Sequence, residues 1–175
     1  MTVSGYFLGV LGVSALLAGC MDLRDTPTCG QEIAAGDLGA FKTPSDAIAV
    51  DSRTGLTWFR CSGGQSPLAG ACVGTPLKLS WEEAKAYAVE FSAASGRTWR
   101  LPTYSEMKDI AESGCQNPAY NQNVFPGLPI ETYWTSSTQI ATTTQACIVF
   151  TYTGLGKCRA FQAEPHHFML VSDPS

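Results

Sequence analysis

The most informative segment of the chain reads Trp99-Arg100-Leu101-Pro102-Thr103-Tyr104-Ser105-Glu106. Pro102 biases Leu101 towards an extended backbone. Thr103 can then cap a helix, and Glu106 three residues later completes a capping box. Gly114 is a suitable residue to end that helix. The segment therefore predicts an extended run that leads directly into a helix, which begins at Tyr104 and ends near Gly114.

A longer helix is predicted just upstream of this segment. Ser80 and Glu83 have the spacing of a second capping box. The apolar positions that follow recur at helical spacing, and they are Trp81, Ala84, Ala88 and Phe91. This helix is expected to start at Trp81 and to bury that face.

Strands are predicted on both sides of the two helices. Residues 47–51 and 56–59 are rich in β-formers and flank the turn Ser52-Arg53-Thr54-Gly55, which predicts a hairpin. Four later β-rich runs are expected to be strands, and they span 133–138, 146–152, 157–161 and 168–171. Two helices followed by several antiparallel strands indicate an α+β fold.

Composition limits the class of protein. A chain of 175 residues is expected to form one domain, and 45% hydrophobic with 15% charged residues is typical of a packed globular chain. The formal net charge is −4, whereas binding to nucleic acid phosphates requires surplus cations. We therefore expect no nucleic acid partner.

The N-terminus has the pattern of an export signal. Residues 5–19 carry no charge and are apolar, but they are too few to span a bilayer, which takes about 20 apolar residues. Leu17-Ala18-Gly19-Cys20 resembles the bacterial lipobox, so residues 1–20 are expected to be a lipoprotein signal and Cys20 to be acylated; the alternative is an ordinary secretory signal or a buried N-terminal hairpin that contains a cysteine. Met21, in place of Asp, predicts delivery to the outer membrane of the cell envelope. The polar, turn-rich residues 21–45 are expected to form a tether to a domain over 46–173.

Six cysteines remain once Cys20 is set aside, and they are Cys29, Cys61, Cys72, Cys115, Cys147 and Cys158. An even number in an exported chain predicts three disulfides. Cys61 with Cys72 is the favoured local pair, because the Gly- and Ser-rich residues between them can fold back as a loop. A zinc site is disfavoured, since there is no C-x-x-C pair and the two histidines, His166 and His167, lie in tandem. Both histidines are expected at the surface.

Five blocks of the chain occur in the order that is typical of a known bacterial family. Their residues are Asp51, Thr54, Gly55, Leu56 and Trp58, then Trp81 and Ala84, then Trp99, Arg100, Leu101, Pro102, Thr103 and Glu106, then Phe125 and Pro126, and finally Tyr133, Trp134, Ser136 and Ser137. On these residues the chain resembles the Lcl C-terminal domain of bacterial surface proteins. It is more distantly similar to formylglycine-generating enzymes. The resemblance implies a C-type-lectin-like fold, here stapled by disulfides.

The charged and aromatic residues of these blocks have two interpretations each. Arg100 could bind a carboxylate or sulfate, but a bond to Glu106 or to backbone carbonyls is favoured. The four tryptophans could stack on sugars, but core packing with paired indole N–H groups is favoured. Glu82, Glu83 and Glu106 could act as a glycosidase pair, although capping already accounts for two of them.

The sequence contains only weak indications of a bound metal or other cofactor. Cys147 and Cys158 could hold copper, as the corresponding pair does in formylglycine-generating enzymes, but a structural disulfide is favoured. Gln116-Asn117-Pro118 faintly resembles a calcium-dependent sugar loop without the carboxylates that a hard cation needs. We expect no metal or other cofactor and no enzymatic activity.

Function is expected to lie in binding. The loop over 116–129, rich in Asn, Pro and Gly, together with 133–138, is the predicted ligand face, and its candidate contacts are Gln116, Asn117, Tyr120, Asn121 and Asn123. The favoured hypothesis is a lipid-anchored adhesion domain for a surface glycan, polysaccharide or protein. Two alternatives stay open: a structural envelope or pilus-associated lipoprotein without a small ligand, and an oxidase of the formylglycine-generating type.

Overall fold

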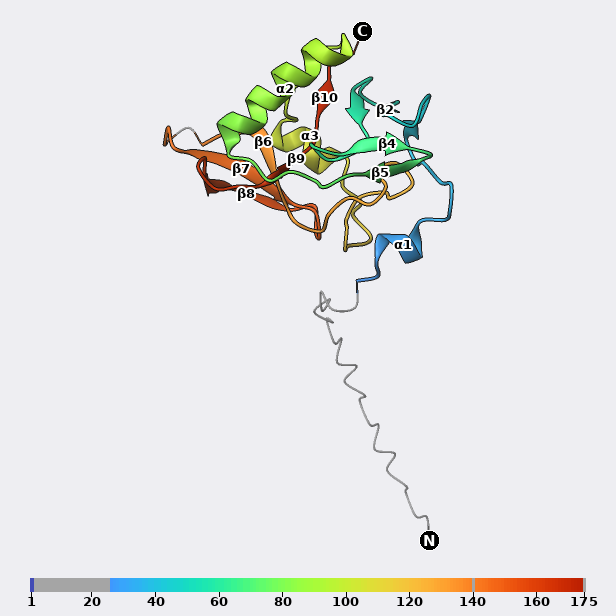
Figure 1. Ribbon diagram of the computed structural model, residues 1–175. Coiled ribbons are helices and arrows are strands. Elements are labelled where there is room, and N and C mark those ends of the chain that lie inside the picture. Colours follow the sequence, from blue (N-terminus) through green and yellow to red (C-terminus); the bar gives the residue numbers. More distant parts are fainter. Residues whose placement is uncertain (2–25, 140, 175) are drawn as a thin grey trace.

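The computed structural model describes residue 1 and residues 26–139 and 141–174 (Figure 1). The expected signal segment over 2–20, its Cys20 and the first part of the expected tether, 21–25, lie outside the described residues. No helix among the described residues has the length and apolar character needed to cross a bilayer.

Two four-stranded sheets and one separate hairpin make up the β-structure. The first sheet has the order β1-β2-β3-β10, with β1 at Phe41–Lys42, β2 at Ile48–Asp51, β3 at Thr57–Phe59 and β10 at Val171–Ser172. All its pairs are antiparallel, and β2 and β3 form the predicted hairpin around a turn in which Gly55 has a φ of 76°. The strand nearest the C-terminus thus closes the sheet that the N-terminal strands begin.

The second sheet has the order β8-β7-β6-β9. Its strands are β6 at Thr132–Thr138, β7 at Gln145–Phe150, β8 at Gly156–Phe161 and β9 at His167–Phe168. The pair β6 and β9 is parallel, so the expectation of purely antiparallel strands is wrong at this edge. The single strand predicted over 168–171 is also wrong, because the chain leaves one sheet after Phe168 and joins the other at Val171, with Met169 and Leu170 fully buried between them.

Helices α2, Trp81–Ser95, and α3, Tyr104–Asp109, begin at the two predicted capping boxes. Gly96, with a φ of 71°, ends α2 in the left-handed conformation that glycine adopts readily. Helix α3 ends at Asp109, with Ile110 as its C-cap, rather than near Gly114. The reason lies in the next residues: Glu112 donates its N–H to Ala119 and Cys115 is held by a disulfide, so the chain turns away from the helix axis.

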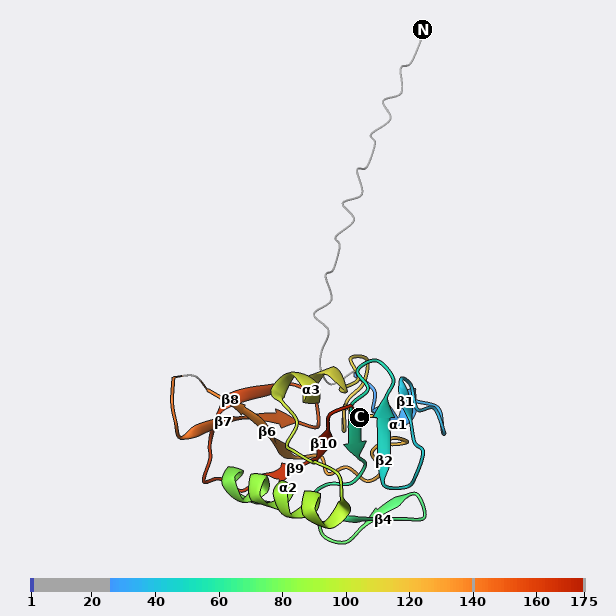
Figure 2. The same cartoon turned by 90° about the horizontal axis from the view of Figure 1, so that it is seen from above.

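The second sheet lies between the two helices, α2 on one face and α3 on the other (Figure 2). Alternation along the strands produces this arrangement, since successive side chains point to opposite faces. Tyr133 and Val149 pack in the core with α3, whereas Trp134 and Ile148 pack in the core with α2. The chain is therefore a mixed α and β domain with two hydrophobic cores.

The domain extends further towards the N-terminus than the predicted boundary at residue 46. A short helix, α1 at Cys29–Glu32, is joined to the loop after α3 by the Cys29–Cys115 disulfide. Phe41 of β1 is buried, and its ring lies 5.6 Å from that of Phe125. The described part of the expected tether is thus folded onto the domain, because two anchoring side chains occur within its polar composition.

The prediction of three disulfides is confirmed, and the pairs are Cys29–Cys115, Cys61–Cys72 and Cys147–Cys158. Cys61 pairs with Cys72 as predicted. The residues between them do not form a simple loop but the hairpin of β4, Ser66–Leu68, and β5, Ala71–Val73. Ala69 and Gly70 turn this hairpin with positive φ values of 50° and 80°.

Candidate functional site

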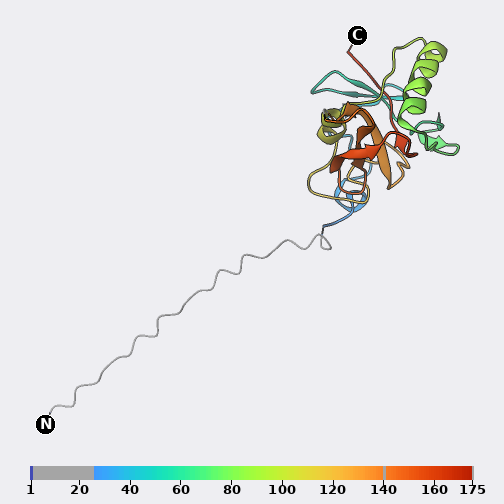
Figure 3. The same ribbon diagram turned by 90° about the vertical axis from the view of Figure 1, so that its left-hand side faces the viewer.

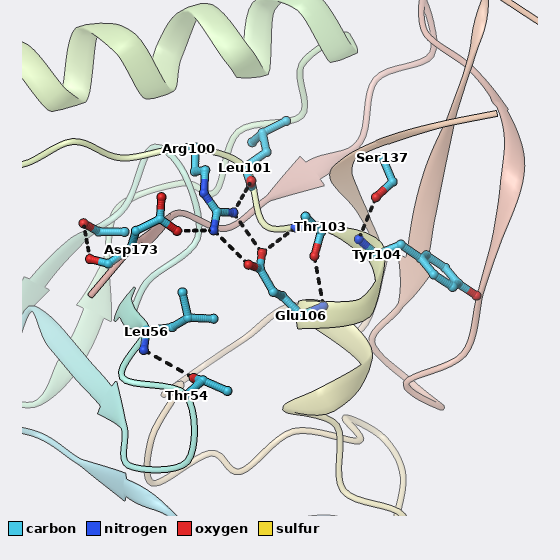
Figure 4. Close-up of polar contacts among 10 residues, drawn as sticks. Thr54, Leu56, Arg100, Leu101, Thr103, Tyr104, Glu106, Ser137 and Asp173 are labelled. Carbon is cyan, nitrogen blue, oxygen red and sulfur yellow. Dashed lines mark hydrogen bonds and ion pairs between the residues drawn. The ribbon is translucent and has the colours of Figure 1, made fainter. Parts of the chain in front are cut away.

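Arg100 joins three separate segments of the chain. Its Nη1 and Nη2 each lie 2.8 Å from a carboxylate oxygen of Glu106, and Nη2 also lies 2.5 Å from Oδ1 of Asp173 (Figure 4). The backbone of Arg100 exchanges two 2.9 Å hydrogen bonds with Val171 of β10. The favoured interpretation of Arg100 as an internal contact of Glu106 is confirmed.

The ionisation of this cluster follows from its hydrogen bonds. Burial favours a raised pKa for Glu106, but the Arg100 guanidinium and the Thr103 N–H, which both donate to it, lower the pKa overall. The bond from Arg100 likewise lowers the pKa of Asp173, and the bond to Glu106 raises the pKa of Arg100. Both carboxylates are therefore ionised near neutral pH and already hydrogen-bonded to Arg100, which makes them poor proton donors.

A polar pocket of about 420 Å³ opens beside this cluster. Its lining residues are Gly96, Arg97, Thr98, Arg100, Ser172, Asp173 and Pro174. A second pocket of about 220 Å³ is mostly apolar, and it is lined by Ala47, Ile48, Phe59, Phe91, Ser95, Arg97 and Trp99. Arg97 borders both, so we call the two together the Arg97 pockets.

Arg97 differs from Arg100 in its partners. Within residues 26–139 and 141–174, no carboxylate forms an ion pair with Arg97, and its closest polar contact is Nη1 to Thr57 Oγ1 at 3.5 Å. Its guanidinium carbon lies 6.0 Å from the Trp99 ring. An uncompensated, half-buried guanidinium beside an apolar pocket is suited to an anionic group that sits next to an apolar one.

The aromatic wall of the smaller pocket is held rigidly. Phe59, Phe91 and Trp99 contact one another edge to face at centroid distances of 4.9 to 6.1 Å. The Trp99 indole N–H donates to Ser95 Oγ at 3.0 Å, and the residue is only 6% exposed. The wall therefore presents ring edges and a recess rather than a flat stacking surface.

The Arg97 pockets lie at one end of the domain. Figures 1 and 3 both place the C-terminal segment and the last turn of α2 at the end opposite to α1, where the described chain begins. Arg97 and Asp173 were not among the residues predicted from the sequence. No short sequence pattern marks either residue, because their surroundings form only when β10, which is distant in the sequence, pairs beside β3 and Arg100.

The predicted ligand face is corrected by the structure. Tyr120 and Asn121 are buried, with Tyr120 donating its hydroxyl to the Met107 carbonyl at 3.0 Å. Asn121 and Asn123 donate their side-chain amides to carbonyls of the N-terminal segment, chiefly that of Asp37. Gln116 donates its N–H to the Pro27 carbonyl, and within this set Asn117 alone is exposed. The loop serves to hold residues 27–39 in place.

The remaining residues of the five blocks are structural. Asp51 is buried and bonded to Arg53, whose hydrogen bonds lower the Asp51 pKa although burial opposes this shift. The core includes Tyr133, Leu56, Leu101 and Ala84. The Leu56 N–H donates to the Thr54 hydroxyl. The Ser136 N–H donates to the Pro102 carbonyl, and the Tyr104 N–H donates to the Ser137 hydroxyl. Three indole groups are paired as expected, whereas Trp58 Nε1 has no partner among the described residues.

The other candidate centres are also occupied by structural contacts. Glu83 and Glu106 cap helices, and Glu82 pairs with Lys85 at 3.0 Å. Cys147 and Cys158 are bonded to each other, which leaves no free thiol to hold copper. Among the described residues, no group of three or more His, Cys, Asp or Glu side chains is placed to bind a metal ion.

The histidines are not the surface residues that were expected. His167 is buried and its Nδ1 donates to the Leu77 carbonyl at 2.8 Å, while His166 Nδ1 lies 2.6 Å from Thr132 Oγ1. Burial lowers the pKa of both rings, and for His166 the nearby Glu164 only partly offsets it. Both rings are therefore neutral in the folded protein at pH 7.

Acidification is expected to destabilise the domain through these two rings. Because the folded pKa of each lies below the ordinary value of 6.5, the unfolded chain binds more protons once the pH falls below 6.5. The contribution of these two rings to stability is therefore fully present above that pH and declines as the pH falls below it through their lowered folded pKa values. Thermal unfolding across this range, repeated with His167→Asn, would measure the effect, and an equal slope in the variant would rule His167 out as its source.

Comparison with known proteins gives one finding. The model of the Lcl C-terminal domain family matches residues 47–172, which includes β2 to β10 and all of the residues that line the Arg97 pockets except Asp173 and Pro174. A search of curated proteins found no match. The five ordered blocks and the family match agree, and the chain belongs to the Lcl C-terminal domain family, a family of bacterial surface-protein domains.

Proposed function

We propose that this protein is anchored in the bacterial envelope through acylated Cys20 and that its domain binds a surface partner at the Arg97 pockets. The apolar segment over 5–19 and the Leu17-Ala18-Gly19-Cys20 sequence support the anchor, and Met21 supports the outer membrane. Three disulfides suit an oxidising compartment outside the cytoplasm.

We also propose that the domain is C-type-lectin-like. Support comes from topology, since strands from the beginning and the end of the domain, β1 and β10, share one sheet with β2 and β3 between them. Both longer helices, α2 and α3, lie between these strands in the sequence. Such folds host varied functions, so the ligand has to be argued from the site.

One observation carries the binding proposal: no carboxylate among the described residues pairs with Arg97, which lies between an apolar and a polar pocket. A glycan, polysaccharide or protein segment that presents an anionic group next to a compact apolar group would fit both. The site also lies at the end of the domain away from α1, so a chain anchored through its N-terminus presents it to the surroundings.

Binding is expected to depend on the Arg97 guanidinium. The oxidised, full-length mature protein should be tested against neutral, carboxylated and sulfated glycans, with and without calcium, and against envelope protein extracts. A charge-assisted hydrogen bond contributes about 1.5–3 kcal/mol, so Arg97→Ala should weaken binding by roughly 10- to 100-fold. Arg159→Ala is the matched control, because Arg159 is exposed on β8, away from these pockets.

The outcomes separate the hypotheses. Equal binding by Arg97→Ala and Arg159→Ala would exclude the Arg97 pockets as the site. The structural lipoprotein would be favoured by two results together: no binding to any glycan, and co-purification of one envelope protein that the Arg97→Ala variant still binds. Loss of binding in Arg97→Ala alone would establish the site and give the chemical class of its ligand.

A further inference from the structure

Three exposed apolar side chains lie at the end of the domain where the chain begins. They are Ile130, Tyr152 and Leu155, which are 51%, 39% and 61% exposed. Tyr152 and Leu155 belong to the turn between β7 and β8, and Ile130 precedes β6. Thr151 donates its N–H to the Glu131 carbonyl at 2.9 Å, which places Ile130 and Tyr152 on neighbouring segments. We call these three residues the proximal patch.

A continuous set of backbone hydrogen bonds links the proximal patch to the N-terminal segment. Asn117 donates its N–H to the Tyr152 carbonyl at 3.0 Å, and Gln116 donates to the Pro27 carbonyl at 2.9 Å. Cys29 in turn donates to the Gln116 carbonyl at 3.1 Å. Figure 1 accordingly shows the β7–β8 turn on the same side of the domain as α1.

The length of the chain between Cys20 and the domain limits how far this end can lie from an anchor. Six peptide steps separate Cys20 from Thr26, the first residue of the described segment. At about 3.3–3.6 Å per extended residue they span at most roughly 20 Å. Acyl chains on Cys20 would therefore keep the proximal patch close to the bilayer surface.

The chemistry of the patch suits the boundary between headgroups and acyl chains. Tyr has an apolar ring with a polar tip, and Ile and Leu can enter the apolar layer. The ring of Tyr152 stacks on Phe150 at 5.3 Å, which supports it from within the sheet. Exposed Lys157 lies beside them, with its Nζ 6.0 Å from the Phe150 ring, and can keep its ammonium among the headgroups.

Charge does not determine this contact. Glu131, the carboxylate next to Ile130, is already paired with Lys78 at 3.2 Å, so it places no unpaired negative charge beside Ile130. Burial of apolar surface therefore drives the contact between the proximal patch and the membrane, so we expect this contact on a zwitterionic lipid bilayer as well.

We propose that Ile130, Tyr152 and Leu155 rest on the surface of the membrane that holds Cys20, so that the domain sits on the bilayer in one orientation. This inference rests on the proposed acylation. It goes beyond that proposal because an acyl tether alone would leave the domain free to turn, whereas the patch fixes which face meets the lipid.

Tryptophan fluorescence can test the orientation in the full-length acylated protein. The four native tryptophans are buried, so Leu155→Trp adds one exposed indole on the patch. Val89→Trp is the matched control, because Val89 is 69% exposed on α2, away from α1. In phosphatidylcholine vesicles that contain brominated lipid, the added fluorescence of Leu155→Trp should be largely lost, whereas that of Val89→Trp should be retained and quenched by aqueous acrylamide.

Each other outcome overturns the proposal in a different way. If the mass of the mature chain includes the acyl chains but both added indoles respond only to acrylamide, the anchor stands and the oriented contact is wrong. Shielding of Leu155→Trp from acrylamide without quenching by brominated lipid would indicate contact with protein instead. A mature chain without acyl chains would overturn both the anchor and the contact.

Discussion

Replacing Cys29 and Cys115 by serine is expected to lower the free energy of unfolding by about 4–5 kcal/mol. The disulfide closes a loop with a sequence separation of 86 residues, and the entropy removed from the unfolded chain grows with the logarithm of loop length. The bond also fastens α1 to the loop after α3, so the same change should release the N-terminal segment.

The Cys61–Cys72 disulfide supplies a control within the same protein. Its sequence separation is 11 residues, for which the same relation gives about 3 kcal/mol. Urea unfolding of the two double-serine variants would measure the difference directly. A loss for the Cys29 and Cys115 variant no greater than for the Cys61 and Cys72 variant would show that strain or residual structure outweighs loop length at this site.

Replacing Arg100 by alanine is expected to cost about 2–3 kcal/mol, between the values for exposed and buried ion pairs. The pair is intermediate in burial, with side-chain exposures of 33% for Arg100 and 19% for Glu106. Removing the guanidinium leaves Glu106 without its bidentate partner and detaches Asp173 from α3. Glu82→Gln breaks the exposed pair with Lys85 but keeps the Lys85 contact with the Trp81 ring, and it should change stability by less than about 0.5 kcal/mol.

Acid unfolding distinguishes this electrostatic role from simple loss of packing. The pKa of Glu106 is lowered in the folded protein. Its contribution to the free energy of unfolding is therefore fully present above its ordinary pKa of 4.5, and it is lost as the pH falls through the folded pKa. Arg100→Ala should flatten the stability profile below pH 4.5, and Arg100→Lys should restore part of it. A profile in Arg100→Ala as steep as that of the native protein would assign the acid sensitivity to other carboxylates.

Local chemistry explains which elements the sequence predicted. The capping boxes at Ser80 and Thr103 and the turn at Gly55 act over three or four residues, and the structure contains all of them. Cys61 and Cys72 were predictable for the same reason, since few residues separate them. The family resemblance depended on these same blocks and is confirmed.

The features that were missed depend on distant segments. Nothing near Met169 indicates that the chain changes sheets there, because both sheets offer it an apolar core. The polar residues of the 116–129 loop suggested a ligand face, but the carbonyls that Asn121 and Asn123 satisfy belong to a segment more than 80 residues earlier. Arg60 illustrates the same limit: it is buried, and its guanidinium donates to the carbonyls of Asn123 and Val124.

The candidate site was predictable only in part. Arg100 and Glu106 lie six residues apart, so their pairing could be proposed from the sequence. Asp173 reaches Arg100 only because β10 pairs with β3, and the aromatic wall beside Arg97 combines α2 with the first sheet. A pocket assembled from such separate parts leaves no short pattern in the sequence.

The placement of β10 has a consequence for the order of folding during synthesis. A chain that emerges N-terminus first carries β1, β2 and β3 long before β10, so the edge of β3 that β10 covers stays open until residues 171–172 have been made. Arg100 also lacks one of its two carboxylate partners until then. The β3 edge therefore stays unpaired, and Arg100 is held by Glu106 alone, until residues 171–173 have been made, so the first sheet is completed late in synthesis.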